Sequence, residues 1–193
     1  MGIEINLLKN YPKTKRNIKD RGADKTEEDR KVARRFGKDF FDGDRKHGYG
    51  GFRYSPKFWQ PVIPAFQQHF SLSAHSSVLD VGCGSGEYML TVAKMGAHVF
   101  GQDLGRTQVN AANNRLKKHQ ASGRAFVGDA QKLSFESNYF DIVYSTDFFE
   151  HICLETKQKV ISEIYRVLKP GGHLVIKTPN LQYLKLIINI NDL

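Results

Sequence analysis

The stretch SVLDVGCGSGEYMLTVAKMGAHVFGQDLG, residues 77–105, decides the fold. It begins with a short β-rich run and continues through three glycines at alternate positions, Gly82, Gly84 and Gly86. Apolar residues at helical spacing follow over residues 87–95, so the pattern predicts a strand, a tight turn and a helix. Because glycine lacks a Cβ and tolerates positive φ, a flat ligand can approach the backbone of such a turn and the N-terminus of the helix.

An acidic residue, Asp103, ends a second predicted strand that begins near Val99. It lies 21 positions after Gly82, close to the roughly 20-residue offset at which an acid binds the ribose hydroxyls of a nucleotide. The stretch therefore predicts a ligand that contains a ribose. The third glycine of a dinucleotide-binding turn is replaced by Glu87, and a carboxylate there would face a phosphate. An adenosyl ligand without phosphates suits this turn better.

The whole stretch resembles motif I of the S-adenosylmethionine-dependent methyltransferases of the Rossmann-like class, types 11 and 12. The resemblance implies an α/β fold with a doubly wound, mostly parallel sheet, and S-adenosylmethionine as the cofactor. A glycine-rich turn with only a folding role is the alternative. The cofactor-binding residues that the resemblance implies are Asp80, Gly82, Cys83, Gly84, Gly86, Asp103, Leu104, Asp129, Ala130 and Ser145.

The same resemblance implies a role for each acid at a strand end. Asp80 would orient the glycine loop or, through water, contact the methionine ammonium, and Asp103 would bind the ribose hydroxyls. Asp129 would accept a hydrogen bond from the adenine amino group, with Ala130 donating its N–H to the ring. Ser145 or its backbone would contact the methionine portion. Each acid taken alone is also typical of a polar cap at the end of a strand.

Composition limits the remaining choices. The 193 residues suffice for one domain with a real core and an appendage. We expect a cytoplasmic protein without membrane insertion, because no apolar run approaches the roughly 20 residues of a span and the N-terminus lacks the apolar core of a signal peptide. Two cysteines, Cys83 and Cys153, make no disulfide framework, which favours a reducing compartment. A nucleophilic Cys83 is an alternative for which no pairing residue is recognisable.

The predicted domains are a basic helical N-terminal extension and lid over residues 1–70 and the cofactor-binding domain over residues 71–193. Residues 9–46 hold 14 Lys and Arg against 8 Asp and Glu, which is +6 of the total +9. Such an arm can bind nucleic acid or an acidic substrate, but its interleaved acids favour a solvated helix of mixed charge. Thr26 with Asp29 predicts a helix N-cap, and an apolar stripe continues to about residue 41.

Aromatic residues are frequent in the turn-rich segment before the first predicted strand. In the family, the helical segment at this place commonly covers the cofactor and shapes the acceptor site. Tyr49, Tyr54 and Trp59 are therefore candidate substrate residues, together with Phe148 after the fourth strand. Simple packing of the extension explains the first three equally well. Residues 36–59 also resemble the leader of methyltransferases associated with bacterial surface-polysaccharide pathways.

Strands and helices alternate along the rest of the chain. The patterns predict helices over 61–70, 106–119 and 155–168, and strands over 124–127, 140–144 and 173–177. Pro170 and Gly171 predict a type II turn before the last strand. Alternation of this kind predicts a five-stranded parallel sheet with right-handed crossovers.

The family's usual C-terminal hairpin has no counterpart in the sequence, where only the apolar residues 181–190 follow the fifth strand. The sheet would then expose an unpaired edge. A truncated chain, a naturally short product or a homodimer through this edge would each explain the pattern, and full catalytic competence is in doubt.

Residues 145–151, with the sequence STDFFEH, follow the fourth strand, where this fold presents residues to the sulfonium and the acceptor. Methyl transfer is an in-line displacement, so the protein aligns the reactants and, for a poor nucleophile, removes a proton. His151 is the candidate catalytic base, because an imidazole exchanges a proton near physiological pH. A capping or packing histidine is the alternative.

Asp147, Glu150 and His151 also resemble the Glu-x-x-Glu-His metal site of ubiquinone-pathway O-methyltransferases and small-RNA 2′-O-methyltransferases. On one helical turn these side chains would converge on a divalent ion that activates a hydroxyl. The chain departs from that pattern by carrying Asp first and by lacking a counterpart of the further histidine of the RNA enzymes. The metal site is therefore the alternative, and the main hypothesis has no metal.

The sequence predicts an S-adenosylmethionine-dependent methyltransferase whose partner is a small hydroxyl-bearing acceptor, such as a sugar or polysaccharide precursor, methylated on oxygen. RNA is the alternative acceptor, supported by the basic N-terminal segment and by the Asp-x-x-Glu-His pattern. A cofactor-binding but inactive module whose apolar C-terminus serves assembly is the third hypothesis.

Overall fold

The structure is a computed structural model that describes residues 5–13, 25–35, 39, 43–44, 46–48 and 60–178. Its contacts divide the chain into two units, Met1–Pro64 and Ala65–Leu193. Within the described ranges, no helix combines the length and the apolar character needed to cross a bilayer.

The first unit contains helix α2, Glu27–Arg34, with the predicted capping box at its start. The Thr26 hydroxyl accepts from the N–H of Asp29 at 3.2 Å, and the Thr26 N–H donates to the Asp29 carboxylate at 2.8 Å. These reciprocal bonds satisfy backbone groups that the first turn leaves free. Three basic side chains pair with acids of the same helix, so α2 neutralises part of its own charge: Arg30, Lys31 and Arg34 with Glu27 and Glu28.

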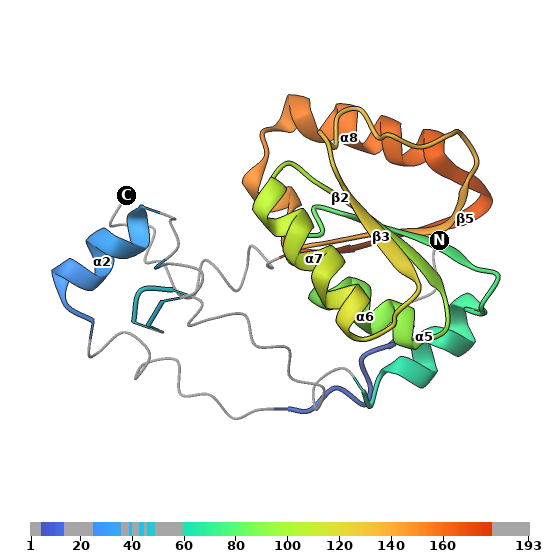
Figure 1. The fold of residues 1–193 in the computed structure, drawn as a ribbon, viewed down its shortest axis with the longest axis horizontal. Helices are drawn as coiled ribbons and strands as arrows, with labels where there is room; N and C mark the ends of the chain where they lie inside the picture. Colours follow the sequence, from blue (N-terminus) through green and yellow to red (C-terminus); the bar gives the residue numbers. More distant parts are fainter. Residues whose placement is uncertain are drawn as a thin grey trace. The chain divides into compact units, whose positions relative to one another are not determined.

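The second unit is built on five parallel strands in the order β3-β2-β1-β4-β5 (Figure 1). The strands are β1 Ser77–Val81, β2 His98–Asp103, β3 Gly123–Val127, β4 Phe140–Thr146 and β5 Leu168–Lys177. Chain order reverses between β1 and β4, and open α/β sheets bind ligands at the carboxyl ends of strands at such a point. The predicted doubly wound, five-stranded sheet is confirmed.

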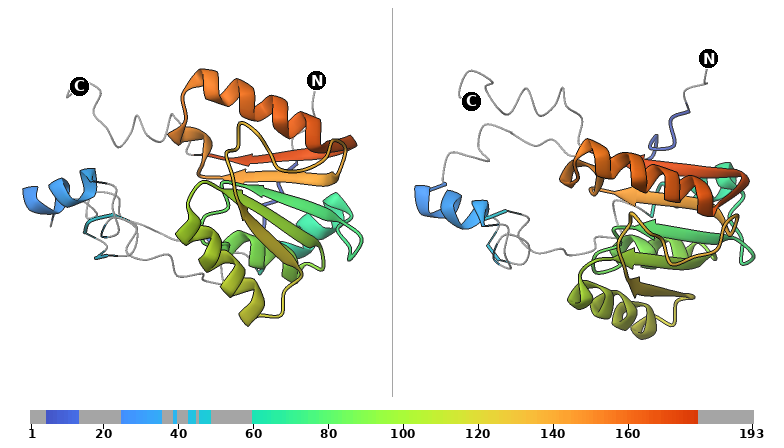
Figure 2. Two further views of the ribbon diagram at one scale, coloured as in Figure 1. Left: turned by 45° about the horizontal axis from the view of Figure 1, so that its top comes forward. Right: turned by 90° about the horizontal axis from the view of Figure 1, so that it is seen from above.

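Helices cover both faces of this sheet (Figure 2). Helix α5, Ile63–Phe70, precedes β1; α6, Glu87–Lys94, and α7, Arg106–Lys118, follow β1 and β2; α8, Leu154–Val167, links β4 to β5. Helices α6 and α7 lie on one face and α8 lies on the other. The connection between β3 and β4 contains turns instead of a helix.

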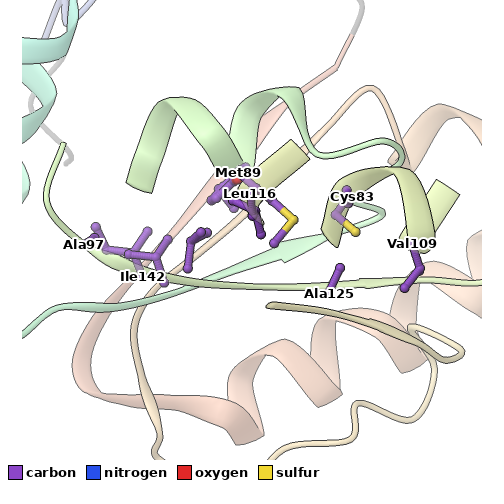
Figure 3. Close-up of a cluster of buried hydrophobic side chains, with 11 residues drawn as sticks. Cys83, Met89, Ala97, Val109, Leu116, Ala125 and Ile142 are labelled. Atoms are coloured by element: carbon purple, nitrogen blue, oxygen red, sulfur yellow. The ribbon is translucent and has the colours of Figure 1, made fainter. Parts of the chain in front are cut away.

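Successive residues of β1 enter different cores, as the two-residue period of a strand requires. Val78 belongs to a buried cluster with residues of α6 and α7, part of which is shown in Figure 3. Leu79 and Val81 belong to a second cluster with residues of α8. Three of the five residues of β1, Val78, Leu79 and Val81, are therefore apolar, because both faces of the strand are buried.

Strand β5 differs from its prediction at its start. It begins at Leu168, which pairs with Phe140, and the register shifts before Ile142 pairs with His173. Gly171 lies in this irregularity with φ +80°, the conformation that a type II turn needs at its third residue. The predicted turn chemistry is present, but it lies at a register irregularity inside the strand, because residues of β5 pair with β4 on both sides of it.

Candidate functional site

The loop between β1 and α6 depends on three glycines in the left-handed region. Gly82, Gly84 and Gly86 have φ values of +77°, +50° and +77°. A Cβ on Gly82 would lie 2.7 Å from Cδ2 of Phe148, and one on Gly86 would lie 2.8 Å from Cβ of Ala112. A Cβ on Gly84 would meet no atom within 4 Å, so this part of the loop borders open space.

The Asp103 carboxylate is held at the carboxyl end of β2 by two backbone groups. The N–H of Gly84 donates to Oδ2 at 2.9 Å, and the N–H of Gly105 donates to Oδ1 at 2.8 Å. Each carboxylate oxygen has a second acceptor position available for a ligand. The acid predicted to bind ribose thus contacts the glycine loop directly and has a fixed orientation.

A cavity of about 340 Å³ opens beside this acid, at the carboxyl ends of the strands. Five predicted cofactor residues line it: Gly82, Asp103, Leu104, Asp129 and Ala130. The remaining lining residues are Gln102, Gly128, Gln131, Phe148, Ile152, Thr156 and Val160. Acidic groups and apolar side chains therefore share one concave surface, as in sites for small organic ligands.

Four other predicted cofactor residues are buried and do not line this cavity: Asp80, Cys83, Gly86 and Ser145. The Ser145 hydroxyl is fully buried and donates to the Val81 carbonyl at 2.8 Å, so it serves strand packing. Cys83 is also buried, and burial raises the pKa of its thiol well above the usual range. A thiol that stays protonated is a poor nucleophile, which argues against a catalytic Cys83.

Asp80 lies under the glycine loop and is 1% exposed. The Tyr144 hydroxyl donates to its Oδ2 at 2.8 Å, while Oδ1 has no partner among the residues that the structure describes. Burial raises the pKa of Asp80 to about 8, against the opposing effect of the Tyr144 bond; the nearby charges of Asp103 and Glu87 raise it further. Asp80 is therefore a buried acid with one free oxygen at the base of the loop.

Glu87 replaces the third glycine of a dinucleotide-binding turn. Its negative charge is compensated by a basic side chain of the protein itself. One carboxylate oxygen accepts from the Ser85 hydroxyl at 3.0 Å, and the other lies 2.6 Å from Nη2 of Arg115. Arg115 also donates to the Ser85 carbonyl. Arg115, a residue of α7, thereby fixes the loop at Ser85 and Glu87.

The residues after β4 do not form the arrangement required by the metal hypothesis. Only Phe149–His151 form a short helical turn, and Asp147 precedes it with φ +53°. Both Asp147 carboxylate oxygens accept from Nζ of Lys177, at 2.7 and 2.6 Å, and Glu150 accepts from the Thr178 hydroxyl. Among the described residues, no group of three or more His, Cys, Asp or Glu side chains could hold a metal ion.

The structure separates the candidate residues for the acceptor. Phe148 lies against Gly82 and lines the cavity. His151 is exposed at the end of the short turn. Phe148 and Ile152 line the cavity, but His151 does not. Tyr49, Tyr54 and Trp59 lie outside the described residues.

Sequence reasoning missed several residues of the lining. Ile152, Thr156 and Val160 come from the approach to α8 and its first turns, whose apolar residues read simply as core. Gln102 had a detectable signal, because it is a polar residue in an apolar strand and directly precedes Asp103. It is 1% exposed in the structure.

Comparison with known proteins identifies this architecture. Residues 79–176, just over half of the chain, match a protein family described as a methyltransferase domain. The chain belongs to this family. Among similar solved structures, a protein from Pyrococcus horikoshii OT3 has a TM-score of 0.61 at 26% identity, over 78% of this chain and 66% of that chain. An S-adenosylmethionine-dependent methyltransferase from Methanosarcina mazei has a TM-score of 0.56 at 28% identity, over 62% and 60%.

Curated relatives of this methyltransferase domain differ in the atom that their names say is methylated. Phosphoethanolamine N-methyltransferase of Plasmodium falciparum is 32% identical over 142 residues, 72% of this chain and 49% of the relative. Sterol 4-C-methyltransferase of Caenorhabditis elegans is 33% identical over 56% of this chain and 33% of its own length. Ubiquinone biosynthesis O-methyltransferase of Coxiella burnetii is 33% identical over 53% and 43%. The chain thus spans between a third and a half of these relatives.

Proposed function

We propose that this methyltransferase domain binds S-adenosylmethionine in the cavity and transfers its methyl group to an oxygen of a small hydroxyl-bearing molecule, such as a sugar or polysaccharide precursor. The observation that carries the proposal is the Asp103 carboxylate, oriented by the N–H groups of Gly84 and Gly105 beside the cavity. A carboxylate in this position can accept hydrogen bonds from both hydroxyls of a ribose.

The lining fits an adenosyl group without phosphates. Leu104, Phe148 and Ile152 supply apolar surface for a flat base, and Asp129 supplies an acceptor for an exocyclic amino group. The donor, when bound, supplies a methyl group activated by a sulfonium. The protein's own contribution is to orient the ribose through Asp103, enclose the base and align the acceptor. Beneath the loop, Asp80 has a buried oxygen without a partner among the described residues, and a cationic group brought there would favour the charged form of this acid against the effect of burial.

Two observations support oxygen as the acceptor atom. One of the relatives is a ubiquinone O-methyltransferase, and His151, whose imidazole can accept a proton, follows β4. His151 is exposed there and can take a proton from a hydroxyl that is brought to it. We keep His151 as the proposed base and the three aromatic residues of the extension as proposed acceptor contacts.

RNA as the acceptor receives less support. The basic side chains of α2 pair with acids of the same helix. The metal pattern shared with RNA enzymes is replaced by the Asp147–Lys177 ion pair. RNA binding that weakens steeply with added salt, together with labelling of RNA by the tritiated donor, would favour this alternative.

Titration calorimetry with S-adenosylmethionine and S-adenosylhomocysteine tests the cofactor assignment. The unchanged protein should bind both, and Asp103→Asn should weaken binding by about 10- to 100-fold, since a charged acceptor is lost. Asp141→Asn is the matched control, because Asp141 also accepts a backbone N–H, from Ser77 at 2.8 Å, but lies near the amino end of β4. If neither ligand releases or absorbs heat when it is added to the protein, the proposal is overturned.

The acceptor is tested separately with tritiated donor and fractionated cell extract. Label in the small-molecule fraction is expected, and transfer to an isolated acceptor should fall at least about 10-fold in His151→Ala if His151 is the base. Donor binding without label in any fraction would favour the inactive module.

A further inference from the structure

The connection from β3 to β4, residues 128–139, forms one wall of the cavity without a helix to stabilise it. It contains Asp129 and Ala130, and it bends in a turn in which the Lys132 N–H donates to the Asp129 carbonyl at 3.0 Å. Outside a helix or sheet, the other backbone groups of such a segment need partners from elsewhere.

The side chain of Gln102, the last residue but one of β2, forms hydrogen bonds with three of these backbone groups. Its Nε2 donates to the Asp129 carbonyl at 2.8 Å and to the Lys132 carbonyl at 3.3 Å, and its Oε1 accepts from the Ser134 N–H at 3.0 Å. The side chain is 1% exposed, so these bonds have no competition from bulk water. A single buried amide therefore holds the turn from both ends.

Packing restricts Gln102 as strongly as its hydrogen bonds do. A Cβ added at Gly128 would lie 2.7 Å from Nε2 of Gln102. Gly128 does not have a positive φ, so its backbone conformation does not require glycine. The amide of Gln102 thus occupies the space in which a side chain at position 128 would lie.

The far end of the same connection is held from α8 and not from the sheet. Glu163 accepts from the Leu133 N–H at 2.8 Å, and Arg166 donates to the carbonyls of Leu133 and Phe135 at 3.0 and 2.8 Å. Neither Glu163 nor Arg166 lines the cavity. In the half of the connection carrying Asp129, Gln102 fixes the backbone from the sheet, while the Asp129 carboxylate accepts from the N–H of Gln131 at 2.9 Å and from its Nε2 at 3.2 Å.

We propose that Gln102 is a positioning residue that sets Asp129 and Ala130 against the base of the methyl donor and so determines base recognition. This proposal rests on the proposed function. Gln102 and Asp103 are successive residues of β2, so one strand end would hold the base-binding turn and the ribose-binding acid in a fixed relation. A shift of Gln102 would therefore impair recognition of the base and leave the ribose contact intact.

Calorimetry with two ligands tests this proposal: S-adenosylhomocysteine and S-inosylhomocysteine, in which the 6-amino group is replaced by oxygen. We expect the unchanged protein to prefer the adenosyl ligand by at least about 10-fold, the scale of one good hydrogen bond to a charged group. Gln102→Met should lower affinity for the adenosyl ligand about 10-fold and change affinity for the inosyl ligand less than about 2-fold. Gly128→Ala should have the same effect by displacing Gln102, and the double variant should be no worse than either single one.

Arg166→Gln is the matched control, because it loosens the same connection away from the cavity. It should lower thermal stability and preserve the preference for the adenosyl ligand. The positioning role would be overturned if Gln102→Met and Gly128→Ala lowered the affinity for both ligands equally. It would also be overturned if Arg166→Gln lost the preference for the adenosyl ligand. If Gln102→Met does not fold, Gly128→Ala decides alone. Failure of the unchanged protein to bind either ligand would instead overturn the proposed function.

Discussion

Asp80 is a carboxyl group that loses its hydration beneath the glycine loop. Burial raises its pKa to about 8, so between about pH 4 and pH 8 the unfolded chain releases this proton while the folded protein keeps it. The free energy of unfolding should therefore fall as pH rises across this range, by up to about 1.4 kcal/mol per pH unit, and level off above it.

Asp80→Asn removes this titration, so its free energy of unfolding should depend less on pH between 5 and 8. The difference in favour of the variant should grow toward pH 8. Urea unfolding at four pH values measures both slopes, with the exposed Glu155→Gln on α8 as the control. Equal slopes for Asp80→Asn and the unchanged protein would contradict the assignment.

Arg115 is the counter-ion of a second buried acid in the site. Glu87 has only 11% of its side chain exposed, so Arg115→Met should leave an unpaired carboxylate and lower the free energy of unfolding by about 2 kcal/mol or more. Thermal and urea unfolding measure the loss. Replacing both residues, as Glu87→Gln with Arg115→Met, should cost less than the sum of the single changes.

Lys159→Met is the control for this ion pair, because Lys159 and Glu155 are exposed on α8. Its effect should stay within about 0.5 kcal/mol. If Arg115→Met costs no more than Lys159→Met, the ion pair does not stabilise the loop.

At the scale of elements, the loop from β1 to α6 combines backbone conformation with close packing. Alanine at any of its three glycines meets left-handed strain of about 1 to 2 kcal/mol. At Gly82 and Gly86 the new methyl group would also collide with Phe148 and Ala112, while at Gly84 it would enter open space. Gly82→Ala and Gly86→Ala should therefore lower the free energy of unfolding more than Gly84→Ala does.

Phe148→Ala separates collision from strain in the same loop. It should recover part of the loss in Gly82→Ala and none of the loss in Gly86→Ala, because only the first methyl group would meet Phe148. Urea unfolding of the single and double variants gives the comparison. Three equal losses among the glycine variants would show that backbone strain alone sets the cost.

At the scale of the whole molecule, every residue that lines the cavity belongs to the second unit. A fragment of residues 60–193 should therefore bind S-adenosylhomocysteine within about 3-fold of the full chain, as measured by calorimetry. A loss of 10-fold or more would show that the N-terminal extension takes part in donor binding. It would then support the proposal that residues 1–70 act as a lid.

Local patterns in the sequence determined the elements and half of the cavity. The spacing of apolar residues predicted the five strands and their helices. The direction of successive side chains along each element decides which of them face the core and are apolar. Three glycines predicted a left-handed loop, because other residues rarely adopt that conformation. Asp103 was found because it ends a strand at about the offset of a ribose-binding acid. Leu104, Asp129 and Ala130 were found through the resemblance to the methyltransferase family.

Only the tertiary structure decided which side chains hold these parts together. Gln102 reaches Asp129, Arg115 reaches Glu87 and Lys177 reaches Asp147 across about 27 to 30 positions of chain. Such pairs leave no periodic signal, because they depend on where separate elements meet in space. The Lys177 pair removed the support for a metal site, and the Gln102 bonds formed the wall of the cavity. Local sequence therefore determined which acids reach the site, and contacts between distant residues determined how those acids are held.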